Sequence, residues 1–421
     1  MRNIFDQYDG SENRLTHALG CCLDKDRRLL RRFVQWMVGR RFIPNQRLEV
    51  SVQRLPGESP IARDEEQRGI PDLWIYDGDS WALVIENKIT ATPSMGQLRR
   101  HLRTAERRFH RVDAAMISPA IPKRSVPWLK HRTWPEVYSW LRRQRAKSPW
   151  ARCLAEYMEA LESRMISDET LGDIMITEFD GIPFNNQHPY GYIEAKRTIR
   201  LAMQELQRDR KLINKLGIDP KARHRTAITG RYSTSVWDMI QLQVARGSKD
   251  FTKFPHLDIG IHVERANVVV TLPNGASSAM RKRLLGRNLD EFSRGVCEIS
   301  PRIQKAIRRF HGAYPFMQVF QKHFLHQRHK GVMDANLEFD LRTIRGSKSG
   351  RVKRQAQWLR AVHDALADKH SNLQLAIGAS LPYGDPKLRS REVLHVIANV
   401  WLACEPWMKL ILGEKASRAR R

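Results

Sequence analysis

A run of apolar residues that ends in charged ones places the strongest constraint on how this chain of 421 residues folds. Residues 81–85 are apolar without interruption, which is typical of a central strand covered on both faces. Residues 70–76 are also rich in β-branched and aromatic side chains, and the turn signal Asp77-Gly78-Asp79 separates the two segments. The sequence therefore predicts a β-hairpin at the centre of a sheet.

Charged residues follow the predicted central strand directly. Glu86 and Lys88 are two positions apart, so they point to the same face of the strand, and Asp72 opens the neighbouring strand. Two converging carboxylates repel each other unless a cation compensates them, and oxygen ligands of this kind suit Mg²⁺ or Mn²⁺. A lysine beside such an ion can orient or deprotonate its water, which indicates metal-assisted phosphodiester hydrolysis.

The alternative is a surface ion pair between Lys88 and either Asp72 or Glu86. A surface pair contributes only about 0–1 kcal/mol, so it gives little reason for charges to end so apolar a strand. The nuclease interpretation is therefore preferred.

The pattern Pro71-Asp72 followed by Glu86-Asn87-Lys88 resembles the PD-(D/E)XK nuclease superfamily. The resemblance implies an α/β fold in which a mixed sheet of the restriction-endonuclease type is flanked by helices. It implies that Asp72 and Glu86 hold Mg²⁺ or Mn²⁺ and that Lys88 is the catalytic partner. The resemblance also implies that the chain is a nuclease, for example an endonuclease, and that its substrate is duplex DNA. By the same resemblance, a role in bacterial antiviral defence is expected.

Two further positions agree with this resemblance. Many members carry a glutamate near the metal on the first helix, and Glu12 lies where the first helix is expected to begin. Some branches place a glutamine, followed four residues later by tyrosine, on the helix after the lysine strand. Gln97 matches the glutamine, whereas position 101 is a histidine. Glu12 and Gln97 are accordingly added to the candidate catalytic residues.

The chain is strongly basic, with 73 Lys and Arg residues against 45 Asp and Glu residues and a formal net charge of +28. This balance favours a polyanionic partner, first nucleic acid and second an anionic membrane; the alternative is a solvated basic surface. A helix expected over residues 97–109 carries arginines at a spacing that can follow a phosphate backbone. The candidate nucleic-acid-binding residues are Arg99, Arg100, Arg103 and Arg107.

The chain is expected to contain two domains. The resemblance covers residues 1–166, and a polar junction leads into residues 167–421, an expected α+β domain of no recognised family that would bind nucleic acid or a protein partner. Alternating patterns there predict strands over 257–263, 268–272 and 335–341. The same region is expected to contain a long helix over 190–216 and a helix over 301–326, among others.

The cysteine pattern and the absence of long apolar segments indicate the cellular compartment in which the chain is expected. The five cysteines form no C-x-x-C pair, and the N-terminus has no apolar signal segment. The longest apolar stretch is interrupted by charges, so no membrane span is expected. A reducing cytoplasm fits these features. The predicted function is a metal-dependent nuclease, and the alternative is an inactive nuclease-like fold that binds nucleic acid or a partner.

Overall fold

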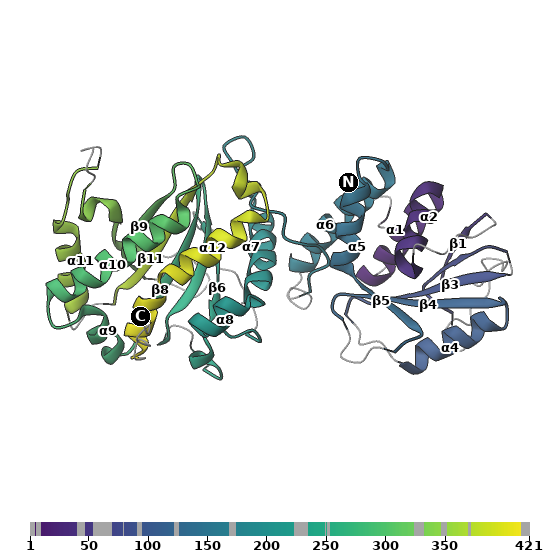
Figure 1. The fold of residues 1–421 in the computed structure, drawn as a ribbon, viewed down its shortest axis with the longest axis horizontal. Coiled ribbons are helices and arrows are strands. Elements are labelled where there is room, and N and C mark those ends of the chain that lie inside the picture. The colour runs from purple at the N-terminus through teal and green to yellow at the C-terminus, as the bar shows by residue number, and fades with distance from the viewer. Residues whose placement is uncertain are drawn as a thin grey trace, which may run out of the picture. The chain divides into compact units, whose positions relative to one another are not determined.

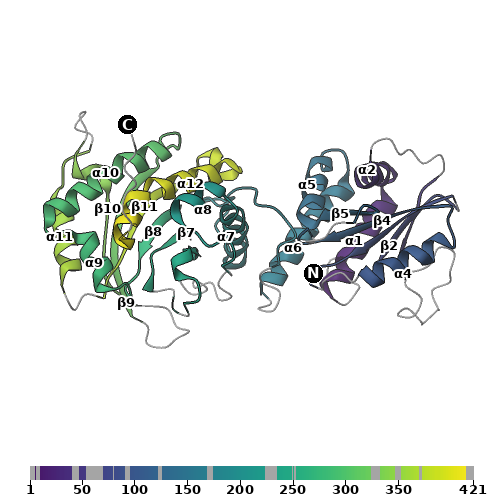
Figure 2. The ribbon, with the colours of Figure 1, turned by 60° about the horizontal axis from the view of Figure 1, so that its bottom comes forward.

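The computed structural model of the chain describes residues 5, 10–39, 47–53, 70–78, 80–90, 95–121, 126–167, 174–222, 235–248, 250, 253–323, 332–346, 352–368 and 372–413. The chain divides into two compact units, Met1–Glu178 and Phe179–Arg421. Figures 1 and 2 show the elements of each unit. In the described part of the chain, no helix combines the length and apolarity that a membrane crossing requires.

The first unit contains a mixed five-stranded sheet in the order β1-β2-β3-β4-β5. The strands β1, β2 and β3 pair antiparallel, whereas β3, β4 and β5 pair parallel. The elements in chain order are α1 (Ser11–Lys25), α2 (Arg27–Val38), β1 (Glu49–Val52), β2 (Leu73–Tyr76), β3 (Trp81–Asn87), α4 (Met95–Glu106), β4 (Arg111–Ser118), β5 (Leu129–Thr133), α5 (Trp134–Gln144) and α6 (Pro149–Ser167).

The predicted hairpin is confirmed, because β2 and β3 pair antiparallel. The Asp77 carboxylate accepts hydrogen bonds from Ser80 Oγ and from the Trp81 backbone N–H, both at 2.7 Å, which closes the turn; Asp79 lies outside the described residues. Every residue of β3 is buried, as the apolar run predicts. The sequence does not predict β5, a half-exposed strand at the edge of the sheet.

Helices cover both faces of this sheet (Figure 1). The helices α1, α2, α5 and α6 share one core with sheet residues such as Leu83, while α4 packs on the opposite face around Trp74. A Cβ at Gly20 would lie 2.4 Å from Val52 Cγ2, so this glycine lets α1 approach β1 closely. Such close packing fixes the position of α1, and with it Glu12 in its first turn.

The second unit contains a six-stranded antiparallel sheet in the order β10-β9-β11-β8-β7-β6, together with helices. This confirms that the unit mixes helices with an antiparallel sheet. Its helices and strands are α7 (Tyr192–Gln207), α8 (Arg210–Leu216), β6 (Ser235–Gln241), β7 (His256–His262), β8 (Arg265–Leu272), α9 (Ser278–Leu285), α10 (Leu289–Ile307), β9 (Tyr314–His323), β10 (Val332–Asp340), α11 (Gln357–Ala367), β11 (Gln374–Pro382), α12 (Glu392–Ala403) and α13 (Glu405–Leu412).

Two of the predicted helices in this unit are wrong in extent. The long helix over 190–216 is two helices, because the Asp209 carboxylate accepts from the backbone N–H groups of Lys211 and Leu212 and starts α8 there. The helix expected over 301–326 ends at Ile307, and the chain then enters β9 after Gly312, which adopts a φ of 72°. The sequence also does not predict β6 or β11.

Candidate active site

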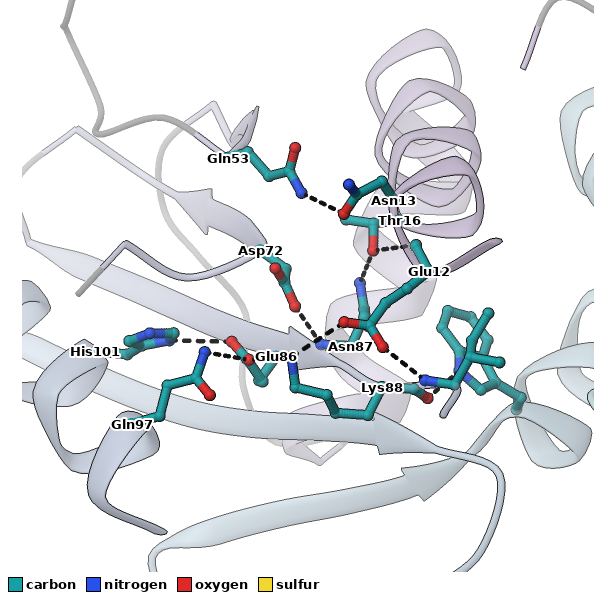
Figure 3. A network of polar contacts seen from close by, with 12 residues as sticks. Glu12, Asn13, Thr16, Gln53, Asp72, Glu86, Asn87, Lys88, Gln97 and His101 are labelled. Atoms are coloured by element: carbon teal, nitrogen blue, oxygen red, sulfur yellow. Dashed lines mark hydrogen bonds and ion pairs between the residues drawn. The ribbon is translucent and has the colours of Figure 1, made fainter. Parts of the chain in front are cut away.

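Figure 3 shows that the charged residues predicted to converge do lie together, where β2, β3 and α1 meet. The register pairs Leu73 of β2 with Ile85 of β3, so the preceding Asp72 lies opposite Glu86. The Asn87 backbone N–H donates to Asp72 Oδ2 at 2.8 Å, which fixes the Asp72 side chain against the end of β3. The two predicted metal ligands therefore occupy adjacent strands at the same edge of the sheet.

A single ammonium group links two of the carboxylates. Lys88 Nζ lies 2.8 Å from Glu86 Oε1 and 3.1 Å from Glu12 Oε1. Glu12 Oε2 also accepts a hydrogen bond from the Ile89 backbone N–H at 2.9 Å. The first helix is thus tied to the end of the central strand through Glu12, in the position that the resemblance implies.

Helix α4 provides two side chains that contact Glu86. Gln97 Nε2 donates to Glu86 Oε1 at 2.9 Å, and His101 Nδ1 lies 3.0 Å from Glu86 Oε2. Gln97 is a predicted site residue, whereas His101 is not, because it stands where the resemblance has a tyrosine. The signal that identifies it is its spacing of four residues from Gln97, which places both side chains on one face of the helix.

Burial and charge shift the pKa values of three of these groups. Burial, and then the negative charge of Glu86, raise the pKa of Asp72 to about 7, although the Asn87 N–H and Lys88 act in the opposite direction. Burial also acts to raise the pKa of Glu86, but hydrogen bonds from His101 and Lys88 outweigh it and hold that pKa below its usual value.

The pKa of Lys88 is also set by burial and by neighbouring charges, which act in opposite directions. Burial alone would lower its pKa, but the hydrogen bond and charge of Glu86 and the charges of Asp72 and Glu12 raise it above its ordinary value. At neutral pH the site therefore contains an ionised Glu86–Lys88 pair beside an Asp72 that is readily protonated. Negative charge is in excess at Asp72, and a further cation there would relieve it.

Uncharged side chains hold this arrangement in place. Asn87 points away from Glu86 and donates from Nδ2 to Thr16 Oγ1 at 3.0 Å, while Thr16 Oγ1 donates to the Glu12 carbonyl oxygen at 2.9 Å. Trp134 Nε1 donates to the Lys88 carbonyl oxygen at 3.0 Å. Sequence reasoning missed these positioning roles, because only the fold brings α1 and α5 to the end of β3.

The donor set suits a hard divalent cation. Among the described residues, no group of three or more His, Cys, Asp or Glu side chains is arranged to hold a metal ion. Mg²⁺ needs less than that, since it commonly takes one or two carboxylates and completes its shell with waters and substrate oxygens. Asp72 and Glu86 end adjacent strands, and because burial and then the charge of Glu86 raise the pKa of Asp72, a cation between the two carboxylates would offset their repulsion.

The four arginines predicted to bind nucleic acid are exposed at the surface of α4 or directly after it. A rotation of 100° per residue places Arg100 and Arg107 on the helix face next to Gln97, with Arg99 and Arg103 farther from the site. Within the residues that the structure describes, none of the four forms an ion pair with a carboxylate. One helix thus presents Gln97 and His101 to Glu86 and four cations to solvent.

Comparison of the chain with protein-family models, with curated proteins and with solved structures gave no match. The chemistry of the site is therefore the basis for assigning a function. Its components are a buried carboxylate–ammonium pair, a second acid with a pKa near neutrality, and an adjacent basic helix.

Proposed function

We propose that the first unit is a Mg²⁺- or Mn²⁺-dependent nuclease domain of the PD-(D/E)XK type that hydrolyses phosphodiester bonds, most directly those of DNA, in the cytoplasm. The observation that carries the proposal is the convergence of Asp72, Glu86 and Lys88 at the end of one buried central strand, with the Lys88 ammonium 2.8 Å from Glu86. An α/β architecture with a mixed sheet is consistent with it. A role in antiphage defence extends the same resemblance.

Each residue has a distinct part in this proposal. Asp72 and Glu86 would hold the divalent cation, which supplies an activated water and neutralises charge on the scissile phosphate. Gln97 and His101 orient the Glu86 carboxylate. The raised pKa of Lys88 keeps it protonated, so it acts as a hydrogen-bond donor that orients the phosphate or the attacking water and stabilises developing negative charge.

Charge supports a nucleic-acid substrate. The net charge of +28 favours polyanions, and the exposed Arg100 and Arg107 lie on the side of α4 that is next to Gln97. Phosphate contacts at these residues would position a strand so that the scissile bond reaches Lys88. The second unit would then hold further nucleic acid or recognise a protein partner.

A second candidate function is binding without cleavage. The observation that favours it is that Lys88 already compensates Glu86 and Glu12, both within 3.1 Å, so these two acids have a cation without any metal. A nuclease-like fold of this kind would bind nucleic acid through α4 and leave it intact.

The deciding experiment incubates the full chain with supercoiled plasmid, linear duplex, single-stranded DNA and RNA, each with Mg²⁺, Mn²⁺ or EDTA. Cleavage is expected only with a divalent ion. It should fall by about 100-fold or more in Asp72→Asn, Glu86→Gln and Lys88→Met, because each variant removes a charge that acts in the transition state. Lys130→Met, at an exposed lysine on β5, is the matched control and should cleave normally.

Two results would contradict the proposal. Cleavage that persists in EDTA, or that is equal in wild type and Lys88→Met, would exclude hydrolysis at this site. Salt-sensitive binding without cleavage under any divalent ion would instead support the second candidate.

A further inference from the structure

One face of the six-stranded sheet in the second unit, called the polar face below, carries buried polar side chains beside a small apolar cluster of Val269, Phe316 and Ala376. The helices α7, α10 and α12 contact the strands and form one layer over a single face of the sheet (Figure 2). Fully buried apolar residues of β8, such as Val268 and Val270, alternate with Asn267 and Thr271. Because side chains alternate along a strand, Asn267 and Thr271 lie on the face opposite the helix layer, and Ser380 joins them from β11.

Two buried side-chain atoms on this polar face, one in Asn267 and one in Ser380, have no hydrogen-bond partner among the residues that the structure describes. Ser380 is fully buried and its Oγ has no partner in the described structure, and the same is true of Oδ1 of Asn267, whose side chain is 6% exposed. Asn267 Nδ2 is 3.3 Å from His262 Nε2, so the other half of the amide is partnered. Buried polar groups are nearly always satisfied, so two adjacent exceptions among the described residues mark this part of the sheet as a candidate binding site.

These two residues belong to a row that crosses five strands. The register pairs Ser380 with Asn267 on one side and with Tyr314 on the other. It also pairs Asn267 with Gly260, and Gly260 with Trp237. The row therefore has a half-buried aromatic ring at each end and the unsatisfied polar atoms between them. The row spans four inter-strand spacings and is therefore about 19 Å long. This length can hold one planar ligand or a few planar groups that are linked to one another.

Two basic side chains, Arg265 and Lys322, lie near His262 on this face, which also carries the carboxylates of Glu338 and Asp258. Arg265 is two residues from Asn267 on the same face, where it donates to Tyr314 Oη at 2.9 Å and to Glu338 Oε1 at 2.7 Å. Burial, and then the charges of Arg265 and Lys322, hold the pKa of His262 at about 4. His262 is therefore neutral at physiological pH, and an anionic group in this place would lie near Arg265 and Lys322, where it would compete with Glu338 for Arg265.

We propose that the row from Trp237 to Tyr314 binds a nucleobase together with its phosphate, either as a free nucleotide or within a single strand of nucleic acid. The half-buried rings of Trp237 and Tyr314 are suited to stacking on bases, and an amide and a hydroxyl can read a base edge by hydrogen bonds. Arg265 and Lys322 supply the charge that a phosphate requires. This inference does not depend on hydrolysis at Glu86 and would stand if the first unit were inactive.

The test measures binding by the full chain in EDTA, where no metal-dependent cleavage interferes. Fluorescence anisotropy follows 12-nucleotide single strands of DNA and RNA carrying fluorescein, and calorimetry follows AMP, GMP, CMP and UMP. Asn267→Leu and Ser380→Ala are expected to weaken binding tenfold or more. Ser380→Ala should not lower the melting temperature, since it removes a buried hydroxyl that has no partner. A merely structural serine would not weaken binding.

The control is Ser300→Ala, which changes a buried serine on α10 away from the polar face and should leave affinity unchanged. Trp237→Leu, at a half-buried end of the row, provides a second test if Asn267→Leu does not fold. Mononucleotide binding identifies a free nucleotide as the ligand, and binding of the strands alone identifies single-stranded nucleic acid. Absence of saturable binding to every probe, or equal affinity in wild type and in the folded row variants, would overturn the proposal.

Discussion

The two proposed sites, one in each unit of the chain, differ in the charge of their buried polar groups. In the first unit, Lys88 lies within 3.1 Å of two carboxylates, Glu86 and Glu12. In the second unit, the row between Trp237 and Tyr314 has the uncharged Asn267 and Ser380 at its centre, each with an atom that has no partner among the described residues. Compensated charges suit a reaction that develops charge, whereas neutral groups without partners suit recognition.

The comparison predicts opposite effects of substitution on stability. Removing one member of a buried ion pair leaves its partner uncompensated and strongly destabilises the fold. Removing a buried group that has no partner costs little, because no interaction is lost. The predictions below test this contrast, beginning with the largest expected effect.

Lys88→Met is expected to have the largest effect. Glu86 is 2% exposed, so the loss of its ammonium partner should cost about 3–5 kcal/mol of unfolding free energy at pH 8. The same substitution should lower metal-dependent cleavage by about 100-fold or more, since Lys88 stabilises the transition state in the proposed mechanism. Urea unfolding followed by circular dichroism measures the first effect, with Lys130→Met as control. Unchanged stability would show that Glu86 and Lys88 do not form the buried pair.

Gly378→Ala should affect only the second unit. A Cβ at this position would lie 2.0 Å from the Val268 carbonyl oxygen, so β11 and β8 would have to separate, at a cost of about 3 kcal/mol. Gly295→Ala on α10 meets nothing within 4 Å and is expected to stabilise the helix by about 0.5–1 kcal/mol. Thermal unfolding compares the two.

Cleavage by the Gly378→Ala variant provides a further check on the contrast between the units. Residues 1–178 form a compact unit of their own, so cleavage should survive a disrupted second sheet. Loss of cleavage in this variant, with the first unit still folded, would show that catalysis requires the second unit.

The sequence predicts a cluster well when the residues that form it are close together in the chain, and poorly when they are far apart. Asp72, Glu86 and Lys88 could be identified because a local hairpin and strand alternation place them together. Glu12 and Gln97 required the family resemblance, and the contact of His101 with Glu86 depends on how α4 packs against β3.

The row in the second unit could not be predicted. It depends on β6 and β11, two strands that the sequence pattern does not reveal, and on a register set by pairing between distant segments. Helical and strand periods are also ambiguous in short apolar runs, so the sequence pattern predicts a helix where the structure has β9. Residues Tyr314 and Ser380 carry no local signal that they are neighbours.

Asp72→Asn should reveal the excess negative charge at the proposed metal site. The folded pKa is about 7, above the unfolded value of about 3.9, so the native state binds more protons between these pH values. Stability of the wild type is therefore expected to fall as pH rises from about 4 to about 7. The shift of roughly three pKa units corresponds to about 4 kcal/mol at pH 8. The Asn variant should lack this loss but accepts a weaker hydrogen bond from the Asn87 N–H than a carboxylate does, so it is expected to be more stable than wild type at pH 8 by about 2 kcal/mol.

Urea unfolding at pH 4 and pH 8, with and without Mg²⁺, measures this effect. Mg²⁺ should stabilise the wild type at pH 8 and leave the variant nearly unchanged, because Asp72 is a proposed ligand. Equal stability of the two proteins at pH 8, or equal stabilisation by Mg²⁺, would contradict the proposed site.

The smallest expected effect is that of a substitution on α4. It distinguishes the α4 arginines from the row in the second unit by how strongly nucleic-acid binding depends on salt concentration. If Arg103 contacts a phosphate, Arg103→Gln should weaken binding of duplex DNA in EDTA and reduce the slope of log affinity against log salt concentration by about one. Arg294→Gln, at an exposed arginine on α10, should leave the slope unchanged. Ser380→Ala removes no charge, so it should weaken single-strand binding at every salt concentration without altering the slope. A change of slope in Ser380→Ala, or none in Arg103→Gln, would show that the division between a charged cluster and a neutral one does not describe how this chain binds nucleic acid.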